Sequence, residues 1–245
     1  MQIKLTPMLE NLDLQNLMVI DIETVPQYSS YEELPEQMQH LWALKTQHQR
    51  KEETPDAFYE RAGIWAEFGK IICISAGVFT KGQPAGFRVK SFAGHDEREL
   101  LVRFAQVLRD QPQNLVLCAH NGKEFDFPYI CRRMLIHGIQ IPPQLQLSGK
   151  KPWEVYHIDT MEIWKFGDYK NYTSLSLLAA IFDIPTPKDD IDGSQVGHVY
   201  WNLNQLGRIC TYCQKDVIAT AQLLRRFRCQ DLIPEENIVI VEPAC

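Results

Sequence analysis

The order of strand-like and helix-like patterns along the chain most constrains its fold. Three runs rich in β-forming residues, 17–23, 70–79 and 86–92, precede the first strong helical stripe at 95–110. After that stripe, strands and helices alternate. The later strands are expected at 114–120 and 155–159, and the helices at 127–137, 160–166, 173–182 and 204–228. This order predicts an α/β fold with a mixed five-stranded sheet, an initial antiparallel meander and helices on both faces.

The segment 27–66 differs in composition from the runs around it. Gln, Glu, His and Lys dominate it, and Leu34, Met38, Leu41 and Leu44 recur at helical spacing. We therefore predict a mostly helical insertion after the first strand. Because the sequence shows neither an internal repeat nor a second apolar core, residues 1–245 are predicted to form a single domain.

Composition and charge exclude several classes of protein. The 245 residues are 45% hydrophobic and 23% charged, which is typical of a globular protein and not of a disordered chain. The net charge of −6 means that a nucleic acid would have to bind at a local basic patch. The longest apolar stretch, 71–79, is far shorter than the roughly 20 residues that cross a bilayer, and no export signal is visible. Seven cysteines in such a chain are expected to be reduced thiols, in a cytoplasmic protein.

Two carboxylates end the first predicted strand. Side chains alternate along a strand, so Asp21 and Glu23 share one face, about 6.5 Å apart along the backbone. At an effective dielectric near 20, two charges 5 Å apart repel by about 3 kcal/mol, and a bound cation would remove that cost. The alternative is that this edge of the strand is simply exposed to solvent.

Two further segments carry acidic or phenolic side chains at informative places. Asp126 lies between the strand at 114–120 and the helix that follows it. Its carboxylate is either a metal ligand at the sheet edge or a cap of that helix. Tyr212 and Asp216 are four residues apart on the last helix and therefore lie on one face, one turn from each other. The same spacing is also common on solvated helices.

Taken together, three segments resemble the motifs of a known enzyme family. They are MVIDIET at 18–24, AHNGKEFDFPYI at 119–130 and YCQKD at 212–216. They are similar to the three exonuclease motifs of DnaQ-like, RNase H-like 3′–5′ exonucleases, in the DEDDy subclass that has Tyr in its third motif. The histidine subclass would place His at position 211, where this chain has Thr211. The chain looks most like predicted exonucleases related to the proofreading exonuclease domain of family B DNA polymerases.

The resemblance implies an RNase H-like fold and a metal-dependent 3′–5′ exonuclease. Asp21, Glu23, Asp126 and Asp216 would hold two Mg²⁺ or Mn²⁺ ions, which prefer oxygen ligands. Two such ions can activate water, stabilise the charged transition state and assist the leaving oxygen in phosphodiester hydrolysis. Our hypothesis is that Asp21 bridges both ions, Glu23 and Asp216 complete the first, and Asp126 holds the second. Tyr212 would position the attacking water.

Other residues near the motifs are candidates for contact with the substrate. Thr24 would meet the terminal nucleotide through its backbone, while Asn121 and Phe125 either shape the pocket or contact the nucleic acid. Six cations surround the second motif and either meet phosphates or form a solvated surface. They are Lys123, Arg132, Arg133, Lys150, Lys151 and Lys165.

The expected partners are nucleic-acid 3′ ends, DNA before RNA, together with replication or repair proteins and without a membrane. No residue in the sequence identifies a contact to a 2′-hydroxyl, so the sequence does not distinguish RNA from DNA. An exoribonuclease is therefore the nearest alternative. A catalytically silent nucleic-acid-binding module of the same fold is the second alternative.

Three tempting features are better explained structurally. Cys210 and Cys213 have zinc-like spacing but no second pair, so packed thiols are predicted. The acidic run 189–194 fails as a calcium loop, because its glycine falls at the wrong position. Asp159 and Glu162 match a capping box and are therefore predicted to cap a helix and not to bind metal.

Overall fold

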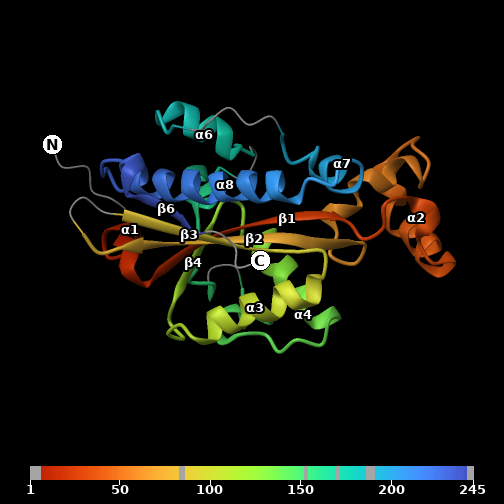
Figure 1. Ribbon diagram of the computed structural model, residues 1–245, viewed down its shortest axis with the longest axis horizontal. Coiled ribbons are helices and arrows are strands. Elements are labelled where there is room, and N and C mark those ends of the chain that lie inside the picture. Colours follow the sequence, from red (N-terminus) through yellow and green to blue (C-terminus); the bar gives the residue numbers. More distant parts are fainter. Residues whose placement is uncertain (1–6, 83–85, 152–153, 169–171, 186–190, 242–245) are drawn as a thin grey trace.

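The computed structural model describes residues 7–82, 86–151, 154–168, 172–185 and 191–241, which form a mixed sheet between two helical layers (Figure 1). The sheet has six strands in the order β5-β4-β1-β2-β3-β6. The strands are β1 (Leu17–Pro26), β2 (Gly69–Thr80), β3 (Gly86–Ala93), β4 (Val116–Ala119), β5 (Ile158–Asp159) and β6 (Ile238–Val241). The first three form the predicted antiparallel meander, and β4, β5 and β6 each run parallel to the neighbour that they join.

Helices cover both faces of this sheet, as predicted. In Figure 1, α8 lies across one face with α6 and α7 on the same side, and α3 and α4 lie against the other face. The helices are α1 (Pro7–Glu10), α2 (Glu36–Arg50), α3 (Glu97–Arg109), α4 (Asp126–Ile136), α5 (Thr160–Lys165), α6 (Leu175–Ile181), α7 (Val196–Trp201) and α8 (Leu206–Phe227). No helix among the described residues is long and apolar enough to span a membrane.

The prediction of five strands is wrong, because β6 adds a sixth at the edge beside β3. Its four residues pair with Phe87–Lys90, about 150 positions earlier in the chain, so no local pattern could indicate the partner. Val239 and Ile240 are half exposed, so the strand also lacks a clear alternation of buried and exposed side chains. The first strand is longer than predicted and ends at Pro26, where a strand end tolerates the missing N–H donor.

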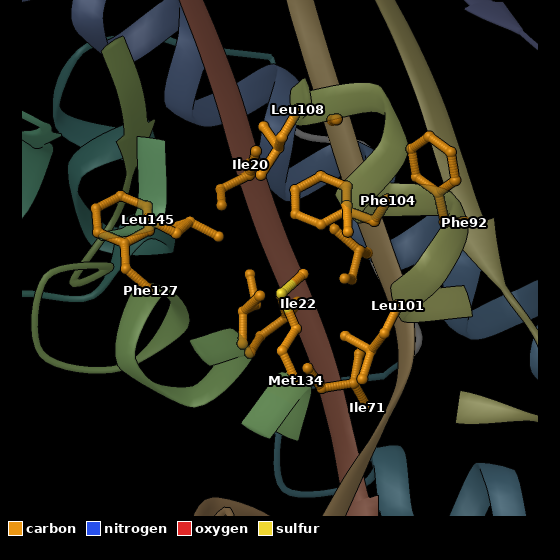
Figure 2. Close-up of a cluster of buried hydrophobic side chains, with 14 of the residues drawn as sticks. Ile20, Ile22, Ile71, Phe92, Leu101, Phe104, Leu108, Phe127, Met134 and Leu145 are labelled. Atoms are coloured by element: carbon orange, nitrogen blue, oxygen red, sulfur yellow. The ribbon is translucent and has the colours of Figure 1, made fainter. Parts of the chain in front are cut away.

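The two faces of β1 bury different cores. Met18, Ile20 and Ile22 pack against the layer of α3 and α4, where Figure 2 shows the isoleucines beside Phe104 and Met134. Val19, on the opposite face, lies in the core beneath α8. Full burial of such a side chain contributes about 1.5–3 kcal/mol, which fixes the direction in which each face of β1 points. Asp21 and Glu23 continue the Val19 face and are therefore turned toward α8.

The insertion after β1 is mostly helical, as predicted, and of the four residues at helical spacing Leu34 and Met38 join its core. It comprises α2 and 3₁₀ turns, including Ala57–Ile64. Leu41 and Leu44 are exposed, because the helix turns Trp42 and Thr46 inward instead. The Trp42 ring is fully buried at the centre of a small aromatic core. Its ring partners, at centroid distances of 5.1–6.0 Å, are Phe58, Tyr59, Trp65 and Phe68.

Candidate active site

Three acidic or sulfur-containing side chains meet where β1 passes under α8. Glu23 is only 7% exposed. One carboxylate oxygen each of Asp21 and Glu23 and the Sγ of Cys213 all lie within 4.8 Å of one another. The Cys213 thiol also donates to the backbone oxygen of Asp21 at 3.4 Å, which ties α8 to β1 at this point. The pairing of β1 with β2 shifts register between Glu23 and Thr24, so a bulge lies at the pocket before the ladder continues to Pro26.

Asp126 is the first residue of α4 and turns its side chain back toward β1. Its Oδ1 accepts the N–H of Ile22 at 3.2 Å, and the residue is 4% exposed. The alternative of a helix cap is wrong, because Phe125 occupies the N-cap position and no side chain caps this helix. The Ile22 bond therefore brings Asp126 next to the strand residue that follows Asp21.

The last helix brings Tyr212 and Asp216 to the same pocket. The Tyr212 hydroxyl hydrogen-bonds the Asp216 carboxylate one turn further along, as the spacing of four residues predicted. The Asp216 charge raises the pKa of Asp21, Glu23 and Asp126, so it acts on all three other carboxylates. The structure thus brings together the five residues that the sequence motifs selected.

Burial and mutual repulsion make these acids unusually weak. The pKa values of Asp21 and Glu23 are raised well above normal, first by burial, then by the nearby Cys213 and the other carboxylates. Burial also raises the pKa of Asp126 to about 7, with the charges of Asp159 and Asp216 adding and backbone N–H bonds opposing. Such shifts are common at functional sites, where charge is held for a ligand.

The donor set fits a divalent cation. Within the described ranges, no Lys, Arg or His forms an ion pair with Asp21, Glu23 or Asp126. Among the described residues, Asp21, Glu23 and Asp126 therefore have no compensating cation, and burying an isolated charge is costly. Hard ions such as Mg²⁺ and Mn²⁺ prefer carboxylate oxygens, so the pocket can supply their ligands.

The three predicted substrate contacts lie around the pocket with structural partners. The Thr24 hydroxyl hydrogen-bonds Tyr129, which in turn donates to Gly63 O at 2.7 Å. Asn121 has a left-handed backbone, at φ 65°, and no group among the described residues hydrogen-bonds its buried Oδ1. The ring of Phe125 is partly buried and lies 5.3 Å from that of Tyr129.

Asp159 caps α5, as predicted, and also holds the loop of the second motif. Its carboxylate accepts the N–H groups of Met161 and Glu162 within α5. It also accepts those of Asn121 and Lys123, at 3.0 and 3.1 Å. The Glu162 side chain does not close the capping box, because it pairs with Lys123 Nζ at 2.6 Å. Asp159 therefore fixes the loop that leads to Asp126.

Four of the six predicted cations line one cavity beside this loop, and one prediction is wrong. The cavity, of about 780 Å³, is lined by Lys123, Arg132, Lys150 and Lys165 together with apolar residues of α4 and the segment after it. Arg133 faces away from this cavity and is 2% exposed. It cannot meet a phosphate there.

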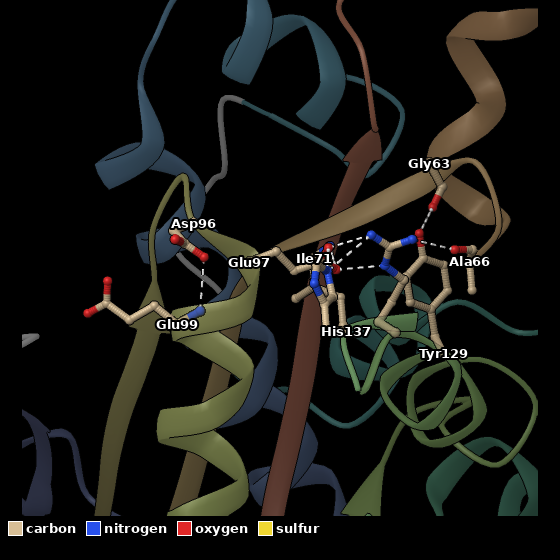
Figure 3. A network of polar contacts seen from close by, with 9 residues as sticks. Gly63, Ala66, Ile71, Asp96, Glu97, Glu99, Tyr129 and His137 are labelled. Atoms are coloured by element: carbon tan, nitrogen blue, oxygen red, sulfur yellow. Dashed lines mark hydrogen bonds and ion pairs between the residues drawn. The ribbon is translucent and has the colours of Figure 1, made fainter. Parts of the chain in front are cut away.

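Arg133 instead belongs to a buried polar network between α3 and α4. Figure 3 shows its partners Glu97 and Ala66 together with His137. Its Nε donates to Glu97 Oε1 at 2.8 Å and its Nη1 to Ala66 O at 2.8 Å. Glu97 also accepts the Ile71 N–H at 2.7 Å, and His137 Nε2 lies 2.7 Å from its other oxygen. The network links the end of the insertion to both helices.

Sequence reasoning missed two neighbours of the pocket. Cys213 precedes Asp216 by three residues, so helical spacing would have placed its thiol on the same face. Tyr172 is largely exposed, and its pKa is raised first by partial desolvation and then by the charges of Asp126, Asp216 and Asp159. The residue precedes α6 and lies outside any periodic run of the sequence, so no pattern indicated that it approaches the pocket. Cys210 and Cys213 are packed thiols, as predicted, and lie against Cys73. Residues 189 and 190 of the acidic run fall outside the described residues.

Comparison with known proteins identifies a family to which most of the chain is similar. Residues 64–236 match a family described as "Predicted 3'-5' exonuclease related to the exonuclease domain of PolB". Asp126, Tyr212 and Asp216 fall inside the matched segment, whereas Asp21 and Glu23 precede it. The match covers well over half of the chain.

Archaeal DNA polymerases are similar over part of the chain. The DNA polymerase of Pyrococcus glycovorans is 26% identical over an alignment of 147 positions, which covers 54% of this chain and 18% of the polymerase. DNA polymerase 1 of Pyrococcus abyssi is 23% identical over an alignment of the same length, with the same coverage of both chains. The matched part thus spans less than a fifth of these relatives.

A solved structure shares the fold. The family B DNA polymerase from Pyrobaculum calidifontis superposes on 86% of this chain, using 24% of its own, with a TM-score of 0.53 and 16% sequence identity. Together with the mixed sheet and its helical layers, this likeness identifies the RNase H-like architecture that the sequence predicted.

Proposed function

Because the chain belongs to this family of predicted 3′–5′ exonucleases, we propose that it hydrolyses phosphodiester bonds at nucleic-acid 3′ ends, with single-stranded DNA as its main substrate. One observation carries the proposal: carboxylates from β1 and α4, far apart in the sequence, surround one pocket with Asp216 of α8, and no cation among the described residues pairs with Asp21, Glu23 or Asp126. A structural role would have paired such buried acids with cations.

The residues take the following roles in this proposal. Asp21, Glu23, Asp126 and Asp216 hold two Mg²⁺ or Mn²⁺ ions, with Asp21 shared between them. When bound, such ions supply an activated water and stabilise the charge that develops on the phosphate. Tyr212 orients the water through its hydroxyl, because a phenol whose pKa is raised by burial stays protonated and cannot act as a base.

The surroundings of the pocket support a nucleic-acid substrate. The cations of the neighbouring cavity could meet backbone phosphates, although Lys123 and Lys165 already face Glu162 and Glu124. We assign Thr24 and Phe125 to the walls that receive the terminal nucleotide. The unpartnered Asn121 oxygen can accept a hydrogen bond from the sugar or base of that nucleotide. Replication or repair proteins in the cytoplasm would present such ends.

A degradation assay tests the proposal. DNA and RNA strands of the same sequence, labelled at the 5′ end, are incubated with the protein in Mg²⁺, in Mn²⁺ or with a chelator. We expect a ladder of 5′-labelled products with DNA in either metal and none with the chelator. Faster shortening of RNA would establish the exoribonuclease instead.

Variants identify the pocket as the source of the activity. D21N and D216N should each abolish cleavage in Mg²⁺, while D231N, which changes an exposed carboxylate, should leave it intact. Wild-type rates in either pocket variant would refute the assignment. If every metal leaves both strands intact although oligonucleotides bind, the silent binding module is the correct reading.

A further inference from the structure

The pocket contains a ligand that the exonuclease motifs do not include. The Sγ of Cys213 lies within 4.8 Å of a carboxylate oxygen of Asp21 and of Glu23, and the residue is fully buried. Bonds from Zn²⁺ are about 2.3 Å to sulfur and about 2.1 Å to oxygen, so two ligands of one tetrahedral ion stand about 3.6 Å apart. Side-chain movements of up to roughly 1 Å would bring all three atoms to that separation around one ion.

A second observation points to the same place. Glu23 is more than nine-tenths buried, yet no hydrogen bond or ion pair from the described part of the chain reaches its carboxylate. The Cys213 Sγ lies within 4.8 Å of this carboxylate. A buried carboxylate in this state is stabilised by a cation that both groups can bind.

We propose that Cys213 joins Asp21 and Glu23 in binding a thiophilic divalent ion, Zn²⁺ or Cd²⁺. On binding, the S–H bond breaks, a metal–sulfur bond forms, and the proton passes to solvent; the thiol's bond to the Asp21 carbonyl is given up. Soft sulfur favours these ions over Mg²⁺, which selects oxygen. Because two carboxylates are shared, this ion competes with the metals of the proposed exonuclease reaction, and that part of the inference rests on the proposed function.

The other two thiols of the cluster around Cys213 provide matched controls. Cys73 and Cys210 pack against Cys213, but neither joins the group of ligand atoms around Asp21 and Glu23 among the described residues. Cys210 lies one turn before Cys213 on α8, so C210S alters the same cluster while keeping the proposed ligand. Serine fits the space of either cysteine and cannot form a metal–thiolate bond.

Cadmium titration of the whole chain tests the site without relying on activity. A Cd²⁺–thiolate bond gives an ultraviolet charge-transfer band, which we expect in the wild type and in C210S and not in C213S. Changes in groups that merely support a metal ligand cost 10- to 100-fold in affinity, so loss of the ligand itself should weaken Cd²⁺ binding by at least roughly tenfold. Circular dichroism confirms that each variant is folded.

The outcomes separate this inference from the proposed function. Absence of the band in the wild type, or its equal loss in C210S and C213S, would overturn the site. If the site is correct and the protein cleaves DNA, Cd²⁺ should inhibit the Mg²⁺ reaction of the wild type and of C210S more strongly than that of C213S, each relative to its own uninhibited rate. A thiolate band in a protein that cuts no nucleic acid would uphold the metal site and reject the exonuclease.

Discussion

The charge of Asp126 should make the metal-free protein less stable as pH rises. Its pKa is about 7 in the folded protein, against an ordinary value of 3.8. Between those pH values the folded chain holds a proton that the unfolded chain has released, so the stabilising contribution is present at low pH and is lost as pH rises through 7. D126N removes this titration, and its amide oxygen can still accept the Ile22 N–H.

The expected magnitude follows from the shift. At about 1.4 kcal/mol per pKa unit, Asp126 should reduce the free energy of unfolding by roughly 2 to 3 kcal/mol between pH 5 and pH 8. The pKa values of Asp21 and Glu23 are also raised, so they add to the same trend. The variant should therefore have a shallower pH dependence and not a flat one. Saturating Mg²⁺ should stabilise the wild type more at pH 8 than at pH 5, since ionised carboxylates bind the ion.

Urea unfolding in the presence of a chelator measures this difference. The midpoint and slope are followed by tryptophan fluorescence at pH 5 and pH 8 for the wild type, D126N and D231N. The control changes an exposed carboxylate and should follow the wild type. An identical pH dependence in D126N and the wild type would show that Asp126 does not titrate in this range, and the reasoning about burial would fail.

Three further changes probe the frame of the pocket. Y212F should slow cleavage by about 100-fold while Mn²⁺ affinity, measured by calorimetry, stays unchanged, because the phenol positions water and holds no metal. D159A should lower the free energy of unfolding by about 2–4 kcal/mol in denaturant titrations, since four N–H groups lose their acceptor. D159N should recover part of this lost stability. G122A should lower the free energy of unfolding by roughly 1–3 kcal/mol, because its new Cβ would lie 2.3 Å from the Cβ of Ala119. In the control G207A the new Cβ has no neighbour within 4 Å, so the melting temperature should rise or stay unchanged.

Local patterns explain why much of the fold could be predicted. The period of two along β1 assigns Ile20 and Asp21 to opposite faces, and the structure buries the first against α3 and α4 and turns the second to α8. Helical spacing placed Tyr212 and Asp216 one turn apart in the same way. Such patterns reflect the geometry of single elements, which depends only on neighbouring residues.

Features set by distant contacts could not be predicted. The β6 strand joins β3 across most of the chain, and Arg133 is buried because Glu97 and Ala66 O stand opposite it. A basic residue beside a motif has the same sequence signal whether it faces a phosphate or a buried carboxylate. The nearness of Cys213 to Glu23 likewise depends on how α8 crosses β1, which no spacing within either element determines.

The insertion is tied to the same elements that carry the pocket. Gly63 O accepts the Tyr129 hydroxyl, which also bonds Thr24, the residue directly after Glu23. The Arg133 guanidinium, one helical turn further along α4, donates to Ala66 O at the end of the insertion. Since α4 begins with Asp126, the insertion contacts both the strand and the helix whose carboxylates face each other. Segment 27–66 is therefore linked by hydrogen bonds to both elements that position these carboxylates.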